Sequence, residues 1–147
     1  MDSFDKRIVR LLQSNSRISF SEIGRDVHLT SPAVAERVKK LKESGVIKGF
    51  TSEVVSRKLG YDFEAMIKLN VRNSNEIESW LNGRPEVIAA HQITGTHNIT
   101  IHLALVNVDH LQSVLKSLSL FSEPKSSVVL NSLGEMRNLP HADFITW

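Results

Sequence analysis

The sequence predicts an α+β fold in which a unit of three helices is followed by a unit of alternating strands and helices. Apolar residues recur with a helical period up to Gly45, and from Tyr61 they alternate with polar residues instead. The charge changes there too: residues 1–60 hold 12 Lys and Arg against 7 Asp and Glu, and residues 61–147 hold 6 against 9. A chain of 147 residues with 41% hydrophobic content has room for one ordinary domain or two small ones, and both changes favour two.

The composition and the distribution of apolar residues exclude several classes of protein. The absence of cysteine excludes disulfides, thiol catalysis and cysteine-ligated zinc. No stretch approaches the run of about 20 apolar residues that a membrane helix needs. Residues 1–5 lack both the basic start and the apolar block of a signal peptide. We therefore expect a cytoplasmic protein without a membrane partner and without a cofactor.

The first helix is predicted by an apolar stripe and a polar start. The stripe consists of Phe4, Ile8, Leu11 and Leu12. Asp2 is the candidate N-cap, with Asp5 at the third helical position. This helix should complete a three-helix core.

Two further short helices follow, each with its own start and stop signals. Ser19 and Glu22 can form a capping box at the start of the first of them. The next begins at Ser31, has Pro32 in its first turn, and stops at Gly45. Two capped helices joined by a tight turn have the outline of a helix-turn-helix.

The turn at residues 27–30 places special demands on the backbone. Val27 and Leu29 should be buried, and His28 stands where such turns usually need a positive φ. Gly24 should cost about 1 kcal/mol relative to alanine within a helix. We therefore expect the backbone of another helix to approach Gly24 closely.

The last of these helices carries the residues expected to read DNA. Its core-facing positions are Val34, Val38 and Leu41. In a helix-turn-helix the start and outer face of the second helix enter the major groove. The candidate contacts are therefore Ser31, Ala33, Glu36, Arg37 and Lys40. A solvated amphipathic helix pair would explain the apolar stripe, but not the two caps, the turn and the basic outer face together. The basic half of the chain also suits a polyanion such as double-stranded DNA.

The residues after Gly45 indicate the organisation of the chain. Residues 46–54 mix β-branched and aromatic side chains, which favours an extended strand, and Gly60 marks a boundary. The expected domains are a helix-turn-helix (winged-helix-like) DNA-binding domain at 1–45, a strand linker at 46–60, an assembly and effector domain at 61–137, and a C-terminal tail at 138–147.

From Tyr61 the pattern predicts the order strand, helix, strand, strand, helix, strand. Alternation over 63–71 gives the first strand, and Asn73 begins a helix that ends at Gly83. The remaining runs predict strands at 87–93 and 99–105, a helix carrying Leu111, Val114, Leu115 and Leu118, and a last strand near Val128 and Leu130. This order is the ferredoxin-like arrangement.

Such a sheet has two helices on one face and leaves the other face uncovered. That face includes Met66 on the first strand, and Ala104 and Val106 on the third. Partial burial against a second subunit would cover it. Because DNA reading by helix-turn-helix proteins usually needs two copies, we expect a dimer held by the C-terminal half.

The chain resembles the Lrp/AsnC (feast/famine) family of transcription regulators over nearly its whole length. The motifs that carry the resemblance are Asp5-x-x-Ile8-x-x-Leu11-Leu12, Asn15-Ser16-Arg17, Ser31-Pro32-Ala33-Val34-x-x-Arg37-Val38-x-x-Leu41 and Gly45-Val46-Ile47-Lys48-Gly49-Phe50. The resemblance implies dimers that assemble further, commonly to octamers, and an amino-acid effector bound between C-terminal domains.

One departure from the family concerns the effector loop. The family commonly has Gly-x-x-Asp at the turn between the second and third strands, whereas this chain has Gly95, Thr96, His97 and Asn98. These four residues are the candidate effector site. A neutral amide replaces the carboxylate that would pair with a ligand ammonium, so the resemblance implies weak amino-acid binding or a different ligand.

Three alternatives compete with an effector-controlled regulator. The first is an effector-independent architectural protein that wraps DNA. The second is an enzyme of the siroheme decarboxylase type, which shares the two-part architecture but is expected to lack a functional reading helix. The third is a metal site at His91, His97 and His102, whose spacing is not a known ligand pattern. Surface or interface histidines are the expected explanation for that group.

Overall fold

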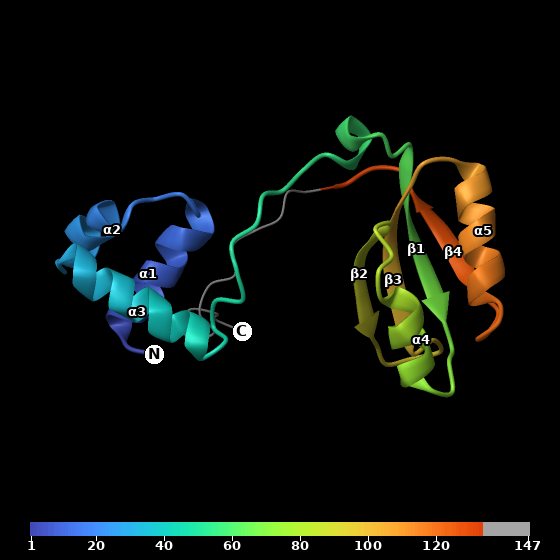
Figure 1. Cartoon of the computed structure of the whole chain (residues 1–147), viewed down its shortest axis with the longest axis horizontal. Coiled ribbons are helices and arrows are strands. Elements are labelled where there is room, and N and C mark those ends of the chain that lie inside the picture. The colour runs from blue at the N-terminus through green and yellow to red at the C-terminus, as the bar shows by residue number, and fades with distance from the viewer. Residues whose placement is uncertain (134–147) are drawn as a thin grey trace. The chain divides into compact units, whose positions relative to one another are not determined.

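The computed structural model describes residues 1–133, which form two compact units, Met1–Ser52 and Glu53–Leu133 (Figure 1). Each unit has its own hydrophobic core. Within the described part of the chain, no helix is long and apolar enough to cross a membrane. The expected C-terminal tail at 138–147 lies outside the described residues.

The first unit consists of the helices α1 (Ser3–Ser14), α2 (Phe20–Val27) and α3 (Ser31–Glu43). Its buried core is formed by Ile8, Leu12, Ile23, Val27, Val34, Val38 and Leu41. The predicted inner face of α3 is therefore confirmed, whereas Phe4 of the predicted α1 stripe stays 40% exposed. Residues 1–52 contain no strand, so this described stretch of the chain forms no wing.

Polar side chains begin all three helices. Asp2 and Asp5 form a reciprocal capping box on α1, and Ser19 and Glu22 form one on α2, as the sequence predicts. Helix α3 begins at Ser31 as predicted, but its cap is the preceding residue, Thr30, whose hydroxyl accepts a hydrogen bond from the Ala33 N–H at 3.4 Å.

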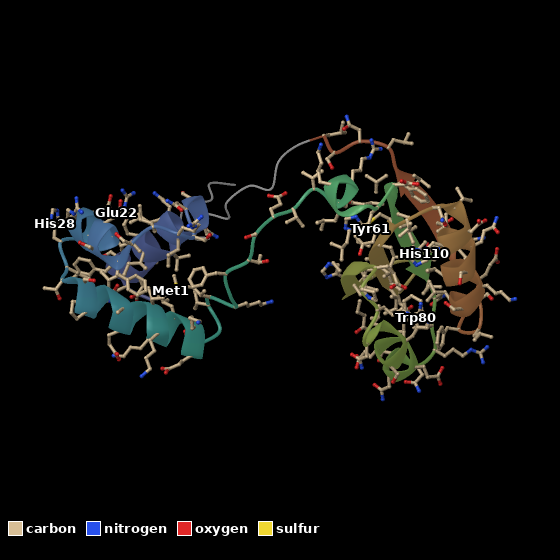
Figure 2. All side chains as sticks on the ribbon, turned by 45° about the horizontal axis from the view of Figure 1, so that its top comes forward. Met1, Glu22, His28, Tyr61, Trp80 and His110 are labelled. Atoms are coloured by element: carbon tan, nitrogen blue, oxygen red, sulfur yellow. The ribbon has the colours of Figure 1, made fainter. Side chains whose placement is uncertain are left out.

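The turn between α2 and α3 has the predicted left-handed residue. His28 has φ 55° and its exposed side chain is labelled in Figure 2. Gly24 is crowded, but not by another helix: a Cβ at this position would collide with the Leu29 carbonyl oxygen, which belongs to the turn itself. The prediction that another helix backbone approaches Gly24 is therefore wrong. The tight turn folds its own carbonyl back onto α2.

The second unit contains β1 (Phe63–Leu69), α4 (Ser74–Leu81), β2 (Val87–Gln92), β3 (Ile99–Leu105), α5 (Val108–Leu118) and β4 (Lys125–Val129). The strands form one antiparallel sheet in the order β2-β3-β1-β4 (Figure 1). Ile77 of α4 and Val114 and Leu118 of α5 pack into one core with the sheet, so both helices cover the same face. The predicted ferredoxin-like arrangement is confirmed.

The expected strand linker is not a strand in the described chain. Residues 46–55 join no ladder, and they are followed by the one-turn 3-10 helix η1 (Ser56–Leu59). A strand needs a hydrogen-bonded neighbour, and the four strands of the sheet are paired only with one another. Val54, Val55 and Leu59 remain at least 60% exposed.

Candidate nucleic-acid interface and effector loop

The outer face of α3 carries most of the residues predicted to contact DNA. Ser31, Glu36 and Lys40 are exposed, and Ala33 is half-buried beside them. The Lys40 ammonium lies 3.7 Å from a Glu36 carboxylate oxygen, one turn away on the same surface. Because both side chains are well exposed, this pair is weak and leaves Lys40 available to a phosphate.

Arg37, which the sequence predicts on the outward face, lies at the edge of that face, with its side chain 30% exposed and directed to α1. Its Nη1 donates to Asp2 Oδ2 at 2.8 Å and to Asp5 Oδ1 at 2.7 Å, and its guanidinium lies 5.3 Å from the centroid of the Phe4 ring. The helical period explains this position: Arg37 is only about 40° around the helix axis from the buried Leu41. The side chain therefore borders the core stripe and reaches α1.

The Arg37 contacts are ionic. The Asp5 N–H and then the Arg37 guanidinium lower the pKa of Asp2. In return, hydrogen bonds to Asp5 and then to Asp2 raise the pKa of Arg37. Both shifts favour the charged forms of Asp2 and Arg37, and the Arg37 hydrogen bonds to Asp2 and Asp5 join α3 to α1.

A second ion pair joins α1 to α2. Arg7 binds Asp26 through two parallel hydrogen bonds, Nε to Oδ1 at 2.6 Å and Nη2 to Oδ2 at 2.8 Å. The hydrogen bonds to Arg7 lower the pKa of Asp26. Two of the arginines that make the first half basic therefore hold the helices together.

Helix α3 carries two further exposed cations that were not among the predicted DNA contacts, Lys39 and Lys42. Lys39 is 67% exposed and lies 3.9 Å from Glu43, and Lys42 lies 6.0 Å from the Phe50 ring centroid. Lys40 is exposed as well, but the helical period places it on the other side of Glu36 from Lys39 and Lys42. The helical period could have identified Lys39, which stands on the side away from the core stripe.

The four candidate effector residues lie together in the turn between β2 and β3. Gly95 has φ 115°, a conformation that favours glycine, and Thr96 is exposed. The turn is closed by a hydrogen bond from the Ile93 N–H to the Asn98 carbonyl at 2.9 Å. His97 is half-buried.

Asn98 uses its side chain for structure. Its Oδ1 accepts from the Val71 N–H at 2.9 Å, and its Nδ2 donates to the Val71 carbonyl at 2.6 Å. The amide therefore ties this turn to the segment that follows β1. The Asn98 Oδ1 that the sequence predicts as a weak acceptor for a ligand ammonium therefore already accepts one hydrogen bond within the chain.

The histidines of residues 1–133 do not form a cluster with metal ligands. The His102 Nε2 lies 2.9 Å from a Glu64 carboxylate oxygen on the neighbouring strand, and the Ser56 hydroxyl donates to the other oxygen at 2.7 Å. Among residues 1–133, no group of three or more His, Asp or Glu side chains could hold a metal ion. His102 instead belongs to a polar chain that ties η1 to the open sheet face.

A helix-turn-helix unit followed by a ferredoxin-like unit defines a two-part class of DNA-binding regulator. Comparison with known proteins agrees with both parts. The AsnC-type helix-turn-helix domain matches residues 1–42, and the Lrp/AsnC ligand binding domain matches residues 64–139.

Individual proteins resemble the chain along most of its length. The HTH-type transcriptional regulator Rv2324 of Mycobacterium tuberculosis is 35% identical over 140 residues, which cover 90% of this chain and 94% of that protein. The structure of Bacillus subtilis LrpC has a TM-score of 0.83 and 25% identity, covering 92% of this chain and 99% of that one. A Neisseria meningitidis transcriptional regulator in complex with L-Met shares the fold, with a TM-score of 0.86, 20% identity and 99% coverage of both chains.

The chain belongs to the Lrp/AsnC family of transcriptional regulators.

Proposed function

We propose that this regulator reads double-stranded DNA with the start and outer face of α3, and that it does so as a homo-oligomer. The observation that supports the reading face is the exposed surface formed by Ser31, Ala33, Glu36 and Lys40 on a capped helix. The first three stand where base edges would be reached, and Lys40 and Lys39 suit phosphates. Arg37, the fifth predicted contact, is instead bound to Asp2 and Asp5.

The experiment that tests DNA reading is selection of DNA fragments by the purified protein, followed by sequencing. A shared sequence among the fragments is expected, and it would define an operator for all later measurements. Fragments without a common sequence would contradict sequence-specific reading. They would instead support the alternative of an architectural, DNA-wrapping protein.

The second unit is the proposed assembly domain. Val54, Val55 and Leu59 are exposed, Met66 lies half-buried on the open sheet face, and Val106 just beyond β3 is 46% exposed. Ala104, which was expected on that surface, is already buried within the chain. Burial of the exposed apolar side chains against a second copy supports at least a dimer, and further assembly to an octamer follows the family. A monomeric full-length protein in light scattering would contradict this.

The turn at residues 95–98 is the proposed effector site, with an amino acid as the ligand class. The glycine conformation lets a ligand carboxylate approach backbone N–H groups, and the similar Neisseria protein was solved with L-Met. Asn98 Oδ1 already accepts from the Val71 N–H, so it offers a ligand ammonium only its second, neutral lone pair, and an acceptor from elsewhere would strengthen binding. Calorimetric titration with the natural amino acids tests this, and the absence of any binding would favour effector-independent regulation.

An enzymatic role is not part of the proposal. The relative named above is a transcriptional regulator, and α3 has an exposed, capped reading face, unlike the degenerate helix expected of a siroheme decarboxylase. Visible absorption after incubation of the purified protein with siroheme would contradict this choice.

A further inference from the structure

The carboxylates of Asp2 and Asp5 each perform two tasks at once. Asp2 Oδ1 accepts the Asp5 N–H at 2.8 Å, and Asp5 Oδ2 accepts the Asp2 N–H at 3.2 Å, which closes the capping box of α1. The other oxygen of each carboxylate accepts a hydrogen bond from Arg37. All four oxygens are therefore occupied, and the arginine is held by groups that the helix start already fixes. We call Asp2, Asp5 and Arg37 the acid clamp.

The acid clamp joins the middle of the reading helix to the first turn of α1. The guanidinium also lies over the Phe4 ring of α1, and Ile8 and Leu12 of α1 share a core with Val34, Val38 and Leu41 of α3. Apolar contacts of this kind have no directional preference. A charged hydrogen bond to two oriented carboxylates is directional. It therefore sets the rotation of α3 about its own axis, and with it the direction in which Ser31, Ala33 and Glu36 point.

The same contacts argue against a direct role of Arg37 in DNA binding. To reach a phosphate or a base, the guanidinium would have to leave both carboxylates and its position over Phe4. Asp2 and Asp5 would then remain as uncompensated negative charges beside the polyanion. The half-buried Arg37 side chain, 30% exposed, is also the least accessible cation among the α3 residues with ion pairs.

We propose that Arg37 is a positioning residue: through the acid clamp it fixes the orientation of α3 for sequence-specific reading, and it does not contact DNA. This inference rests on the proposed function of α3 as the reading helix. It makes the first turn of α1, which lies outside the helix-turn-helix itself, part of the specificity of the protein.

A double-mutant cycle in the full-length protein tests the proposal. The measured quantity is the ratio of operator affinity to affinity for unrelated DNA, because long-range charge affects both DNAs alike. Arg37→Gln and the pair Asp2→Asn with Asp5→Asn should each lower this ratio about tenfold, and asparagine keeps the helix cap. In the Asp2→Asn, Asp5→Asn background, Arg37→Gln should change the ratio by less than about twofold, since the clamp is already gone.

Lys40→Gln is the matched control, because it removes one charge from the same helix without touching the clamp. It should be additive with the aspartate substitutions, and it should reduce the slope of log affinity against log salt by about 1. Arg37→Gln should leave that slope unchanged. Arg37→Lys keeps the charge on a shorter side chain and removes the planar guanidinium that lies over the Phe4 ring, so it should lose part of the specificity that Arg37→Gln loses.

Two outcomes would overturn the proposal. One is an undiminished effect of Arg37→Gln in the double-asparagine background. The other is a tighter and more specific operator complex when the aspartates are replaced, which would mean that the freed arginine binds DNA. Circular dichroism confirms that each variant is folded at the temperature of measurement. If the wild-type protein selects no operator at all, the proposed function fails instead, so the two failures are distinguishable.

Discussion

Replacing Asn98 by aspartate tests which contacts hold the effector turn, because the substitution replaces the side-chain N–H donor with a carboxylate oxygen, which can only accept. Asn98 Nδ2 donates to the Val71 carbonyl at 2.6 Å, and a carboxylate has no hydrogen to donate. Leaving that carbonyl of the buried Val71 without its partner should cost about 1–3 kcal/mol. A charge-assisted bond from the Val71 N–H offsets part of this, so we expect a net loss of about 1–2 kcal/mol in the free energy of unfolding.

The assay is urea unfolding at neutral pH, followed by the fluorescence of Trp80 in a Trp147→Phe background. Trp80 reports on the unit of residues 53–133, which contains Asn98, since its indole N–H donates to the Ser117 hydroxyl of α5 at 3.1 Å. The exposed Asn70 gives the matched control, and Asn70→Asp should change stability by less than about 0.5 kcal/mol. An Asn98→Asp protein as stable as the wild type would refute the structural role of the amide.

Three further predictions concern the first unit. Gly24→Ala should destabilise it by about 1–3 kcal/mol through collision with the turn carbonyl, and a raised melting temperature, as helix propensity alone would give, would contradict this. Lys40→Ala should weaken binding to operator and unrelated DNA alike in a salt titration, whereas a loss confined to the operator would indicate base contact. The folded unit lowers the pKa of Asp2, Asp26 and Glu22 below their ordinary values of 3.8, 3.8 and 4.5. The stabilisation that these three carboxylates give the folded unit is therefore complete above their ordinary pKa values, and it is lost as the pH falls through their lower folded pKa values. Acid titration should then lower the melting temperature, and an unchanged melting temperature would contradict these carboxylate contacts.

Local chemistry made much of the fold predictable. The capping residues Asp2 and Ser19 were identified because a short polar side chain three residues before an acid satisfies specific N–H groups. His28 was identified because few non-glycine residues tolerate a positive φ. The prediction of a strand at residues 46–54 was wrong. β-branched residues indicate a preference for extended backbone, but a strand also needs a neighbouring strand to form hydrogen bonds with.

The candidate site was less predictable, since it depends on partners distant in sequence. Arg37 and Asp5 are 32 positions apart, and only the packing of α1 on α3 brings them together. The helical period alone could have shown that Arg37 borders the core. Nothing in the sequence shows that Asn98 binds Val71, because that contact depends on the register between β1 and β3.

The two cores share no residue, and this has a genetic consequence. A mutation that unfolds the helix unit leaves the sheet unit with its own core intact. If the sheet unit carries assembly, as proposed, such a chain still joins normal copies and supplies a subunit that cannot read DNA. Core mutations in residues 1–52 should therefore act as dominant negatives when both alleles are expressed, whereas mutations such as a polar residue at Ile101 should be recessive.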